Sequence, residues 1–407
     1  MPIAAEDLVS SSGVHITVRT QTLVRTLRRA RDEGLIATFV HSHPDGPRSF
    51  SPQDDRGEPL MAELARNRNG RNTPFLSLLT ARDGQLTARL WSTDASPAAL
   101  DLVRVVGERL RLHYKGRFGD ETPKAFHRQA LAFGPALNKD LAALRLGVVG
   151  CGATGSATAM LLGRLGARRL AAFDKDLVDE SNLSRMHGAT RADIGRPKVD
   201  VVKEYVEGFG LGAEVVTFQA WISDRACRDA LKSCDVIFGC TDDHDGRLLL
   251  NRLAYFYHVP VIDMGIDIGL GPHSILGADV RVTTVMAGVR CLLCRNVIGP
   301  QEAYAEQLER SDPDEYRRRV NERYVRGGGN RSPAVVHFTT DAATMAIDEL
   351  IHMLTAYRRA AASHRVRKFH LLADKRPGAV RNPDCPLCAN EDYWGRGDVE
   401  PFLDRVG

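Results

Sequence analysis

From residue 144 onward, short apolar runs alternate with longer segments in which apolar positions recur at helical spacing. The runs are LRLGVVG, RLAAFD, AEVVTF, CDVIFGC and PVIDMGI, which begin at residues 144, 169, 213, 234 and 260. Apolar strands separated by helices are typical of a parallel, doubly wound, Rossmann-like α/β sheet. A last helix is predicted over 338–357. The charged stretch 301–331 has no apolar periodicity and runs into RGGGNRS, which predicts a mobile crossover loop over about 295–331.

The first part of the chain has shorter elements and more turn residues. The elements predicted there are a strand over 14–18, a helix over Thr22–Arg31, a strand over 35–40, a loop over 44–58, a helix near 60–67, a hairpin over 73–91 and an amphipathic helix over 98–113. The polar segment HYKGRFGDETPK comes next and is typical of a linker. We therefore predict two domains, a smaller α/β domain over 1–116 and a larger one over 117–407.

Composition and charge narrow the classes of function. The 407 residues exceed one ordinary hydrophobic core, which agrees with two domains. The 55 basic residues nearly balance the 51 acidic ones, which does not favour nucleic-acid binding. Apolar runs fall short of the ~18–20 residues of a membrane span, and the start lacks signal-peptide features. We expect a cytoplasmic protein whose eight cysteines are reduced and available for metal binding or catalysis.

The first candidate site is a glycine loop. GVVGCGATGS places Gly150, Gly152 and Gly155 after a predicted strand and at the start of a helix. Glycines allow a tight turn and close approach to phosphate, and the helix N-terminus offers unpaired N–H groups. Asp174 ends the next strand, where a carboxylate can accept hydrogen bonds from ribose hydroxyls. Taken alone, these residues fit an NAD enzyme as well as an ATP enzyme.

Three further motifs accompany the glycine loop, namely DKDLVDESNLSRM from residue 174, GRPK from residue 195 and CTDDHDGR from residue 240. Together they resemble the ThiF/MoeB family, the adenylating domain shared with ubiquitin-activating enzymes. The residues that match the family pattern are Asp174, Asp176, Ser181, Asn182, Leu183, Arg185, Lys198, Asp242 and Arg247. Asp243 stands in place of the usual Asn, and Met186 in place of the usual Gln. The resemblance covers about 116–390.

The resemblance implies that the enzyme binds ATP and Mg²⁺ and transfers AMP to a carboxylate. Such a transfer needs positive charge around the α-phosphate and the departing pyrophosphate, and a carboxylate that holds magnesium. Arg185 and Lys198 would supply the charge, Asn182 a neutral hydrogen-bond donor and Asp242 the magnesium ligand. Within FHRQALAFG, Arg128 resembles the family arginine that reaches the neighbouring subunit's ATP site, which implies a homodimer. An exposed helical arginine is the alternative for this residue.

Two C-x-x-C pairs indicate a metal site. Cys291 and Cys294 form one pair, and Cys385 and Cys388 form the other. Four thiolates complete the tetrahedral shell of a structural Zn²⁺. The resembled family has the same arrangement near its C-terminal segment. Core positions are expected for the other cysteines, including Cys151 in the glycine loop.

The sequence leaves the acyl acceptor open. Ubiquitin-activating relatives use a loop cysteine between the two zinc pairs, but here only Cys385 lies between Cys294 and Cys388. The reaction could stop at the adenylate, as in MoeB-like relatives, or another nucleophile could attack. Alignment with autophagy-type activating enzymes puts the cysteine position at or next to Ser332, with Ser311 a second candidate. A serine would need a base; Ser332 could instead cap a helix that begins at Pro333.

Near the amino end, HSHPDGPRSFSPQD resembles the metal motif of JAMM/JAB isopeptidases. His41, His43 and Asp54 fit its zinc ligands, and Ser51 fits the serine that stabilises the tetrahedral intermediate. That family also needs a glutamate as general base. The chain offers only Glu6 and Glu33 before His41, and neither fits well. Either the domain is shortened at its amino end, or the chain begins inside a longer protein.

Three interpretations of this domain stay open. It is an inactive scaffold that binds a second zinc ion, an active isopeptidase that uses Glu6, or a loop without metal. A JAMM-like domain joined to a ThiF-like domain resembles proteins of bacterial ubiquitin-like conjugation operons, some of them linked to phage defence.

The leading hypothesis is an enzyme that adenylates the C-terminal glycine of a ubiquitin-like protein and passes it to a ubiquitin-carrier-like (E2-like) protein. The alternatives are activation of a sulfur-carrier protein, an isopeptidase with a ThiF-like binding module, and an NAD oxidoreductase. The oxidoreductase would leave Arg185, Lys198 and the cysteine pairs without a role.

Overall fold

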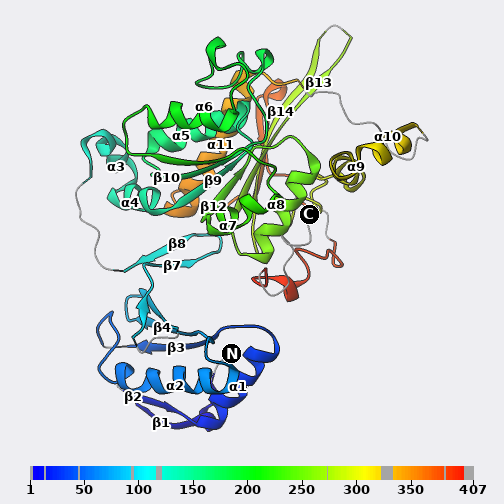
Figure 1. Ribbon diagram of the computed structural model, residues 1–407. Coiled ribbons are helices and arrows are strands. Elements are labelled where there is room, and N and C mark those ends of the chain that lie inside the picture. Colours follow the sequence, from blue (N-terminus) through cyan, green and yellow to red (C-terminus); the bar gives the residue numbers. More distant parts are fainter. Residues whose placement is uncertain are drawn as a thin grey trace. The chain divides into compact units, whose positions relative to one another are not determined.

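The computed structural model of the chain describes residues 3–12, 15–44, 46–92, 96–115, 122–272, 274–321, 333–379 and 382–397 (Figure 1). The chain divides into two compact units. Unit 1 contains residues 1–105 and 111–119, and unit 2 contains residues 106–110 and 120–407. Each unit has its own sheets and its own buried core.

Unit 1 is a small α/β unit. Its elements are β1 (Leu8–Ser12), β2 (His15–Val18), α1 (Thr20–Asp32), β3 (Ala37–His43), α2 (Asp54–Asn69), β4 (Phe75–Ala81), β5 (Leu86–Trp91), β6 (Ala98–Ala99), β7 (Leu102–Val105) and β8 (Arg111–Tyr114). Strands β3 to β6 form a four-stranded sheet, in which β3 and β4 are parallel and the other pairs are antiparallel. Alternate residues of β4 are buried, and its Phe75 packs with Leu27 of α1 and Ala62 of α2.

Two sequence-based predictions in unit 1 were wrong. Helix α2 begins at Asp54, inside the stretch predicted as a loop, with two acidic residues in its first turn where they favour the helix dipole. Strands β6, β7 and β8 replace the helix predicted over 98–113. The segment LVRVVG contains β-branched residues at alternating positions and a glycine, which favour a strand and a turn over a helix.

Unit 2 is larger and contains most of the helices. Its elements are α3 (His127–Phe133), α4 (Pro135–Ala143), β9 (Arg145–Val149), α5 (Ala153–Leu165), β10 (Arg169–Phe173), α6 (Lys198–Glu207), β11 (Glu214–Phe218), α7 (Arg225–Ser233), β12 (Val236–Gly239), α8 (His244–Phe256), β13 (Val261–Leu270), β14 (Ile275–Val285), α9 (Pro300–Ser311), α10 (Pro313–Asn321), α11 (Val336–Thr355), β15 (His364–Lys368) and β16 (Ala373–Lys375).

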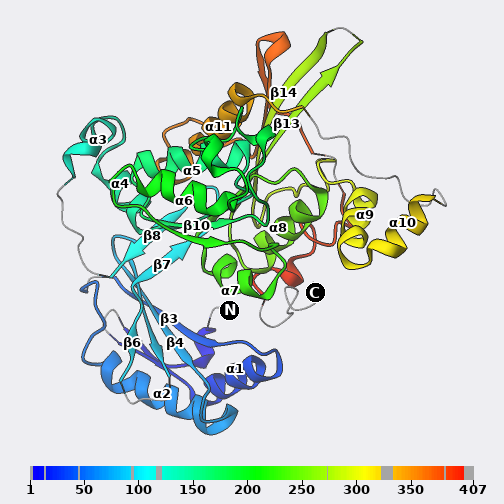
Figure 2. The same cartoon turned by 45° about the horizontal axis from the view of Figure 1, so that its top comes forward.

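The central sheet of unit 2 has eight strands in the order β11-β10-β9-β12-β13-β14-β15-β16. Strands β9 to β13 are parallel, which confirms the parallel part of the prediction. Strands β14, β15 and β16 are antiparallel to their neighbours, so the sheet is mixed rather than wholly parallel. In Figures 1 and 2, α5, α6 and α11 cover one face of this sheet, and α7 and α8 pack on the other.

Residues 300–321 form two helices, which corrects the prediction of a loop over about 295–331. Helix α9 buries only the small residues Ala303 and Ala305, and α10 buries Tyr316. Such sparse burial gives no clear apolar period in the sequence. Residues 322–332 lie outside the described part of the chain.

Among the described helices, none is both long enough and apolar enough to cross a membrane.

Candidate functional site

The carboxyl ends of three neighbouring strands bring the predicted nucleotide-binding residues to one edge of the sheet. Phe173 of β10, Val149 of β9 and Gly239 of β12 are paired side by side. The glycine loop follows β9, Asp174 follows β10, and Asp242 follows β12 after two intervening residues. The strand order reverses here, because the chain passes from β9 to β10 on one side and returns at β12 on the other. Doubly wound sheets bind ligands at such a reversal.

The glycine loop packs with no room for a side chain at two positions. Gly150 has a φ of +86°, and a Cβ there would lie 2.9 Å from the carbonyl oxygen of Cys240. A Cβ at Gly155 would lie 1.7 Å from the carbonyl oxygen of Gly150. Gly152, the N-cap of α5, has open space where its Cβ would be. The turn into α5 therefore requires glycine at Gly150 and Gly155, and it brings the unpaired N–H groups of the first turn of α5 next to the end of β9.

Asp174 ties the glycine loop to β10. Its two oxygens accept hydrogen bonds from the N–H of Cys151 at 2.6 Å and the N–H of Asp176 at 2.8 Å. Burial raises the pKa of Asp174, and nearby Lys198 opposes that shift. Lys198 is only 9% exposed. Its Nζ forms an ion pair with Oδ2 of Asp176 at 3.0 Å. Burial alone would raise the pKa of Asp176, but hydrogen bonds from Lys198 and Lys175 hold it below its ordinary value.

The segment after β10 places Asn182 and Arg185. Asn182 is 6% exposed, and its Oδ1 accepts a hydrogen bond from the N–H of Asp179 at 3.0 Å. Its amide NH₂ group is therefore the part that could donate to a ligand. The guanidinium of Arg185 donates to the carbonyl oxygen of Ser181, one turn earlier in the chain.

Asp242 is exposed directly before the N-terminus of α8. Nη1 of Arg247 donates to its carbonyl oxygen at 3.3 Å, and Nη2 donates to the carbonyl oxygen of Met264 at 3.3 Å. Arg247 thereby ties the backbone of the Asp242 loop to β13 and leaves the carboxylate of Asp242 at the surface. Exposed carboxylates that face phosphate are typical Mg²⁺ ligands.

The two departures from the family pattern have structural explanations. Met186 is 4% exposed, so an apolar side chain suits its position. Asp243 is the N-cap of α8, and its side chain accepts a hydrogen bond from the N–H of Gly246. Asp and Asn serve equally well as N-caps.

Helix α9 contacts the N-terminus of α8, which the sequence did not indicate. Glu306 accepts a hydrogen bond from the N–H of Asp245 at 2.8 Å, and the N–H of Gly299 donates to Nδ1 of His244 at 3.0 Å. Arg310 forms an ion pair with Asp245. Burial raises the pKa values of Glu306 and Asp245. These contacts join residues far apart in the sequence, so no local pattern could have signalled them.

Three further predicted residues of unit 2 have no described contact with the carboxyl ends of β9, β10 and β12. Arg128 is exposed on α3. Ser311 is exposed at the end of α9, and Ser332 lies outside the described residues.

The four paired cysteines form a compact cluster. The Sγ atoms of Cys291 and Cys385 lie 3.6 Å apart, as do those of Cys294 and Cys388, and all four lie within 4.8 Å of one another. Zn–S bonds of about 2.3 Å place tetrahedral sulfurs about 3.8 Å apart. The cluster therefore fits a Zn²⁺ ion. Cys151, Cys227 and Cys234 are buried elsewhere in unit 2, and Cys240 is half-buried.

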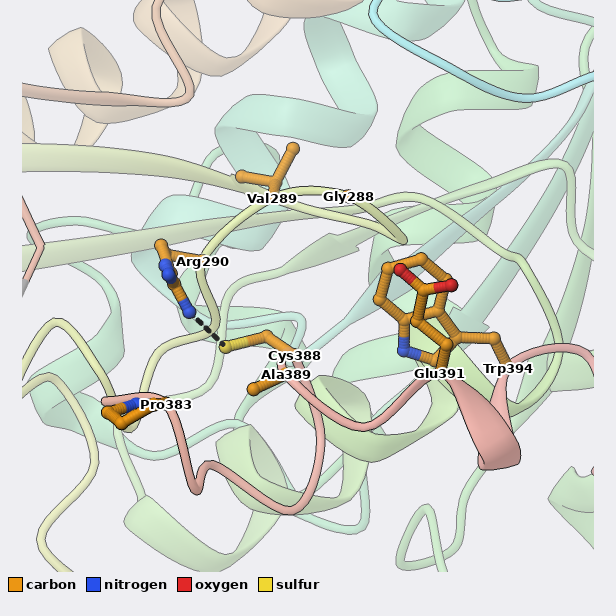
Figure 3. Close-up of a pocket in the computed structure, with 8 residues that line it drawn as sticks. All are labelled: Gly288, Val289, Arg290, Pro383, Cys388, Ala389, Glu391 and Trp394. Atoms are coloured by element: carbon orange, nitrogen blue, oxygen red, sulfur yellow. Dashed lines mark hydrogen bonds between the residues drawn. The ribbon is translucent and has the colours of Figure 1, made fainter. Parts of the chain in front are cut away.

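A polar hollow of about 370 Å³ adjoins the cysteine cluster (Figure 3). Nη1 of Arg290 points to Sγ of Cys388 at 3.9 Å, and Glu391 and Trp394 line the other side. An arginine beside a thiolate reduces the negative charge that four sulfurs concentrate on a metal ion.

In unit 1, the predicted metal ligands lie together. Nε2 of His41 lies 3.2 Å from Oδ1 of Asp54, and Nε2 of His43 lies 3.2 Å from Oδ2. The N–H and Oγ of Ser51 both donate to Oδ2 of Asp54 at 2.7 Å. Burial lowers the pKa of His41, which favours the neutral imidazole that binds metals. One ligand atom from each of the three residues lies within 4.8 Å of the others, which fits a metal ion.

Neither glutamate that precedes His41 has a described contact with His41, His43 or Asp54. Glu6 is exposed, and Oε1 of Glu33 accepts a hydrogen bond from Arg29 at 2.8 Å. Glu58 was not indicated by the sequence, because it follows the motif. It lies one turn beyond Asp54 on α2 and is 1% exposed.

One oxygen of the buried Glu58 carboxylate has hydrogen-bond partners. Its Oε2 accepts hydrogen bonds from Arg89 at 2.7 Å and from Trp91 at 3.1 Å. Its Oε1 is buried and has no hydrogen-bond partner among the described residues.

Curated relatives match part of the chain. The adenylyltransferase and sulfurtransferase UBA4 of Meyerozyma guilliermondii is 30% identical over 115 residues, which cover 28% of this chain and 27% of that protein. The SAMP-activating enzyme E1 of Haloferax volcanii is 28% identical over 129 residues, which cover 32% of this chain and 48% of that protein. The matched part of the chain thus spans less than half the length of either relative.

Solved structures share the fold. The structure of E. coli MccB with ATP superposes with a TM-score of 0.51 at 16% identity and covers 66% of this chain and 76% of that one. The family model described as "ThiF family" matches residues 126–387, which is more than half of the chain. The chain therefore belongs to the ThiF family.

Proposed function

We propose that the protein uses ATP and Mg²⁺ to adenylate the C-terminal glycine of a ubiquitin-like protein. The observation that carries this proposal is the meeting of the glycine loop, Asp174 and Asp242 at the carboxyl edge of β9, β10 and β12 in a ThiF-family chain. Relatives are named as adenylyltransferases, and one is named as an activating enzyme. An oxidoreductase would not need Lys198 or Arg185 at this edge.

Each residue would have a distinct role in the transfer. The α5 N-terminus and the glycine loop would bind phosphate, and Asp174 would accept hydrogen bonds from the ribose. Lys198 and Arg185 would offset the charge that builds on the α-phosphate and on the departing pyrophosphate. Asn182 would donate a neutral hydrogen bond. Mg²⁺, held by Asp242, would supply further positive charge to the phosphates.

The partners follow from the same proposal. The substrate would be a ubiquitin-like protein, and an E2-like carrier would receive its acyl group. Arg128 would reach the ATP site of a second copy in a homodimer, since its exposure on α3 leaves it free to contact another chain. Activation of a sulfur-carrier protein is the second candidate, because UBA4 is named as both adenylyltransferase and sulfurtransferase. Both candidates share the adenylation step and differ in the acceptor.

Replacement of Asp242 should abolish adenylation. We expect Asp242→Ala to lower the exchange of labelled pyrophosphate into ATP at least about 100-fold, because the magnesium ligand is lost. Exchange should require a ubiquitin-like protein with a C-terminal glycine, which we would supply from candidate partners.

Asp243→Asn is the matched control. It restores the usual family residue and keeps the N-cap of α8, so exchange should stay near that of the unaltered enzyme. Full exchange in Asp242→Ala would contradict the proposed role of Asp242.

We also propose that the two cysteine pairs together hold one structural Zn²⁺, and that His41, His43 and Asp54 hold a second ion in a unit without isopeptidase activity. Of the two glutamates before His41, Glu33 forms an ion pair with Arg29 and Glu6 is exposed, which supports the lack of isopeptidase activity. Chains analysed for metal should then contain about two zinc ions each.

Single substitutions separate the two metal sites. Cys385→Ser should lose one ion and lower the melting temperature, while His43→Ala should lose the other ion alone. Cys227→Ser, which alters a buried cysteine outside the cluster, should keep both. Zinc content that is unchanged in Cys385→Ser would contradict the four-cysteine site, and hydrolysis of a ubiquitin-like fusion would contradict the inactive assignment of unit 1.

Finally, we propose that the acyl group passes through an oxyester on Ser332. A trapped adduct between the two proteins should then be cleaved by hydroxide or hydroxylamine and be lost in Ser332→Ala. Ser311→Ala is the comparison, because Ser311 is the other serine candidate. An adduct that survives Ser332→Ala would exclude that residue. If the unaltered enzyme forms the acyl-adenylate but no covalent adduct, its reaction stops at the adenylate.

A further inference from the structure

Strands β13, β14 and β15 carry a polar strip on one face of the sheet. Val280 and Val282 of β14 are buried on the face that packs against α11. The alternate positions carry Arg281 and Thr283, which pair with Gly265 and Asp263 of β13. Residues paired across neighbouring strands point to the same face, so these side chains lie together on the side away from α11.

A carboxylate at the centre of this strip faces two arginines. Asp263 is 0% exposed. Nη2 of Arg281 donates to both of its oxygens at 3.2 Å, and Nε of Arg247 lies 3.4 Å from Oδ1. Nη1 of Arg281 donates to Oγ1 of Thr283 at 2.7 Å, and this Oγ1 lies 2.8 Å from Nδ1 of His364. The two guanidinium groups therefore share one buried carboxylate.

The cluster has an excess of positive charge. Both arginines are cations at any physiological pH. Burial, together with the charges of Arg295 and Arg281, lowers the pKa of His364 to about 4, so this histidine is neutral at neutral pH. Asp279, the next carboxylate of β14 on the same face, pairs with Lys368 of β15. Asp267, opposite Asp279 on β13, is exposed at the end of the strip. Among the described residues, Asp263 is the one carboxylate within 4.0 Å of Arg247 and Arg281. Two partly buried cations thus share one local negative charge, which is costly unless an anion binds.

The excess charge lies beside the proposed nucleotide site. The side chains of Arg247 and Arg281 are 13% and 15% exposed, so an incoming group can reach them. Arg247 also contacts the carbonyl oxygen of Asp242. The guanidinium of Arg281 occupies the space beside Gly265, because a Cβ at this position would lie 2.6 Å from Nη2 of Arg281. The cluster is therefore suited to an anion that reacts next to ATP.

We propose that Arg281, together with Arg247, binds the C-terminal carboxylate of the protein substrate before adenylation. This inference rests on the proposed function and names the residues that recognise its acyl substrate. A carboxylate oxygen attacks the α-phosphorus of ATP, a C–O–P linkage forms, and the bond from the α-phosphorus to the bridging oxygen of pyrophosphate breaks. The proton count is unchanged, because both the carboxylate and ATP enter as anions.

This arrangement also explains selectivity and release. An amidated C-terminus has no negative charge for the two arginines to bind. Once the carboxylate has become the mixed anhydride, its own charge is gone and the hydrogen bonds to the guanidinium groups weaken. The activated chain end can then leave for its acceptor.

Binding of two matched peptides tests the site without requiring turnover. N-acetyl-glycylglycine carries a C-terminal carboxylate, and its amide is neutral. With the full chain, Mg²⁺ and a non-hydrolysable ATP analogue at constant ionic strength, we expect saturable binding of the acid and at least about tenfold weaker binding of the amide. Arg281→Met should weaken binding of the acid about tenfold, and Arg281→Lys should weaken it less, because lysine keeps the charge but not the planar fork.

Arg367→Met is the matched control. Arg367 belongs to β15, but it pairs with Asp341 of α11 and therefore lies on the opposite face. It should leave binding of the acid unchanged. Equal binding of acid and amide, or wild-type affinity in Arg281→Met, would overturn the proposal. If the methionine variant fails to fold, Arg281→Lys decides instead, and wild-type affinity there would also overturn it.

Kinetics separate this inference from the proposed function. In pyrophosphate exchange with a protein substrate, Arg281→Met should raise the KM for that substrate about tenfold and leave the KM for ATP within about twofold. Absence of exchange in the unaltered enzyme would contradict the proposed function. Exchange that is normal in Arg281→Met would contradict the carboxylate site alone.

Discussion

Close packing of the glycine loop against the ends of β9 and β12 is the constraint on which the proposed nucleotide site depends. A methyl group at Gly155 would overlap the carbonyl oxygen of Gly150, and one at Gly150 would meet the backbone at Cys240. Because neither glycine has a side chain, β9 turns directly into α5 and the Asp242 loop lies against that turn. Hydrogen bonds from Cys151 and Asp176 to Asp174 then join β10 to the same edge.

Charge organises the surroundings of that edge. Lys198 is nearly buried and is paired with Asp176, so its positive charge next to the proposed nucleotide site is balanced. The reverse holds around Asp263, where two arginines share one carboxylate. We infer that the Lys198–Asp176 pair is complete without a ligand, whereas the two arginines around Asp263 can also bind a negatively charged substrate. Helix α9 adds a third element, since Glu306 satisfies the N-terminus of the helix that follows Asp242.

The sequence predicted those parts of the fold that local pattern determines. The apolar runs predicted strands β9 to β13. The glycine loop, Asp174 and Asp242, found from their motifs, follow the carboxyl ends of β9, β10 and β12. Local pattern failed where tertiary contacts decide: α9 forms against α8 through Glu306 and Arg310, and no apolar period marks it. Asp263 and Arg281 were missed for the same reason, because strand register brings them together from separate segments.

A crystal structure of the full chain with Mg²⁺ and a non-hydrolysable ATP analogue would show whether the nucleotide binds at the carboxyl ends of β9, β10 and β12. We predict that the α-phosphate lies against the loop Gly150–Gly155, that the ribose hydroxyls contact Asp174, and that Mg²⁺ is coordinated by Asp242. A nucleotide bound away from this edge, or a magnesium ion that Asp242 does not coordinate, would contradict the account.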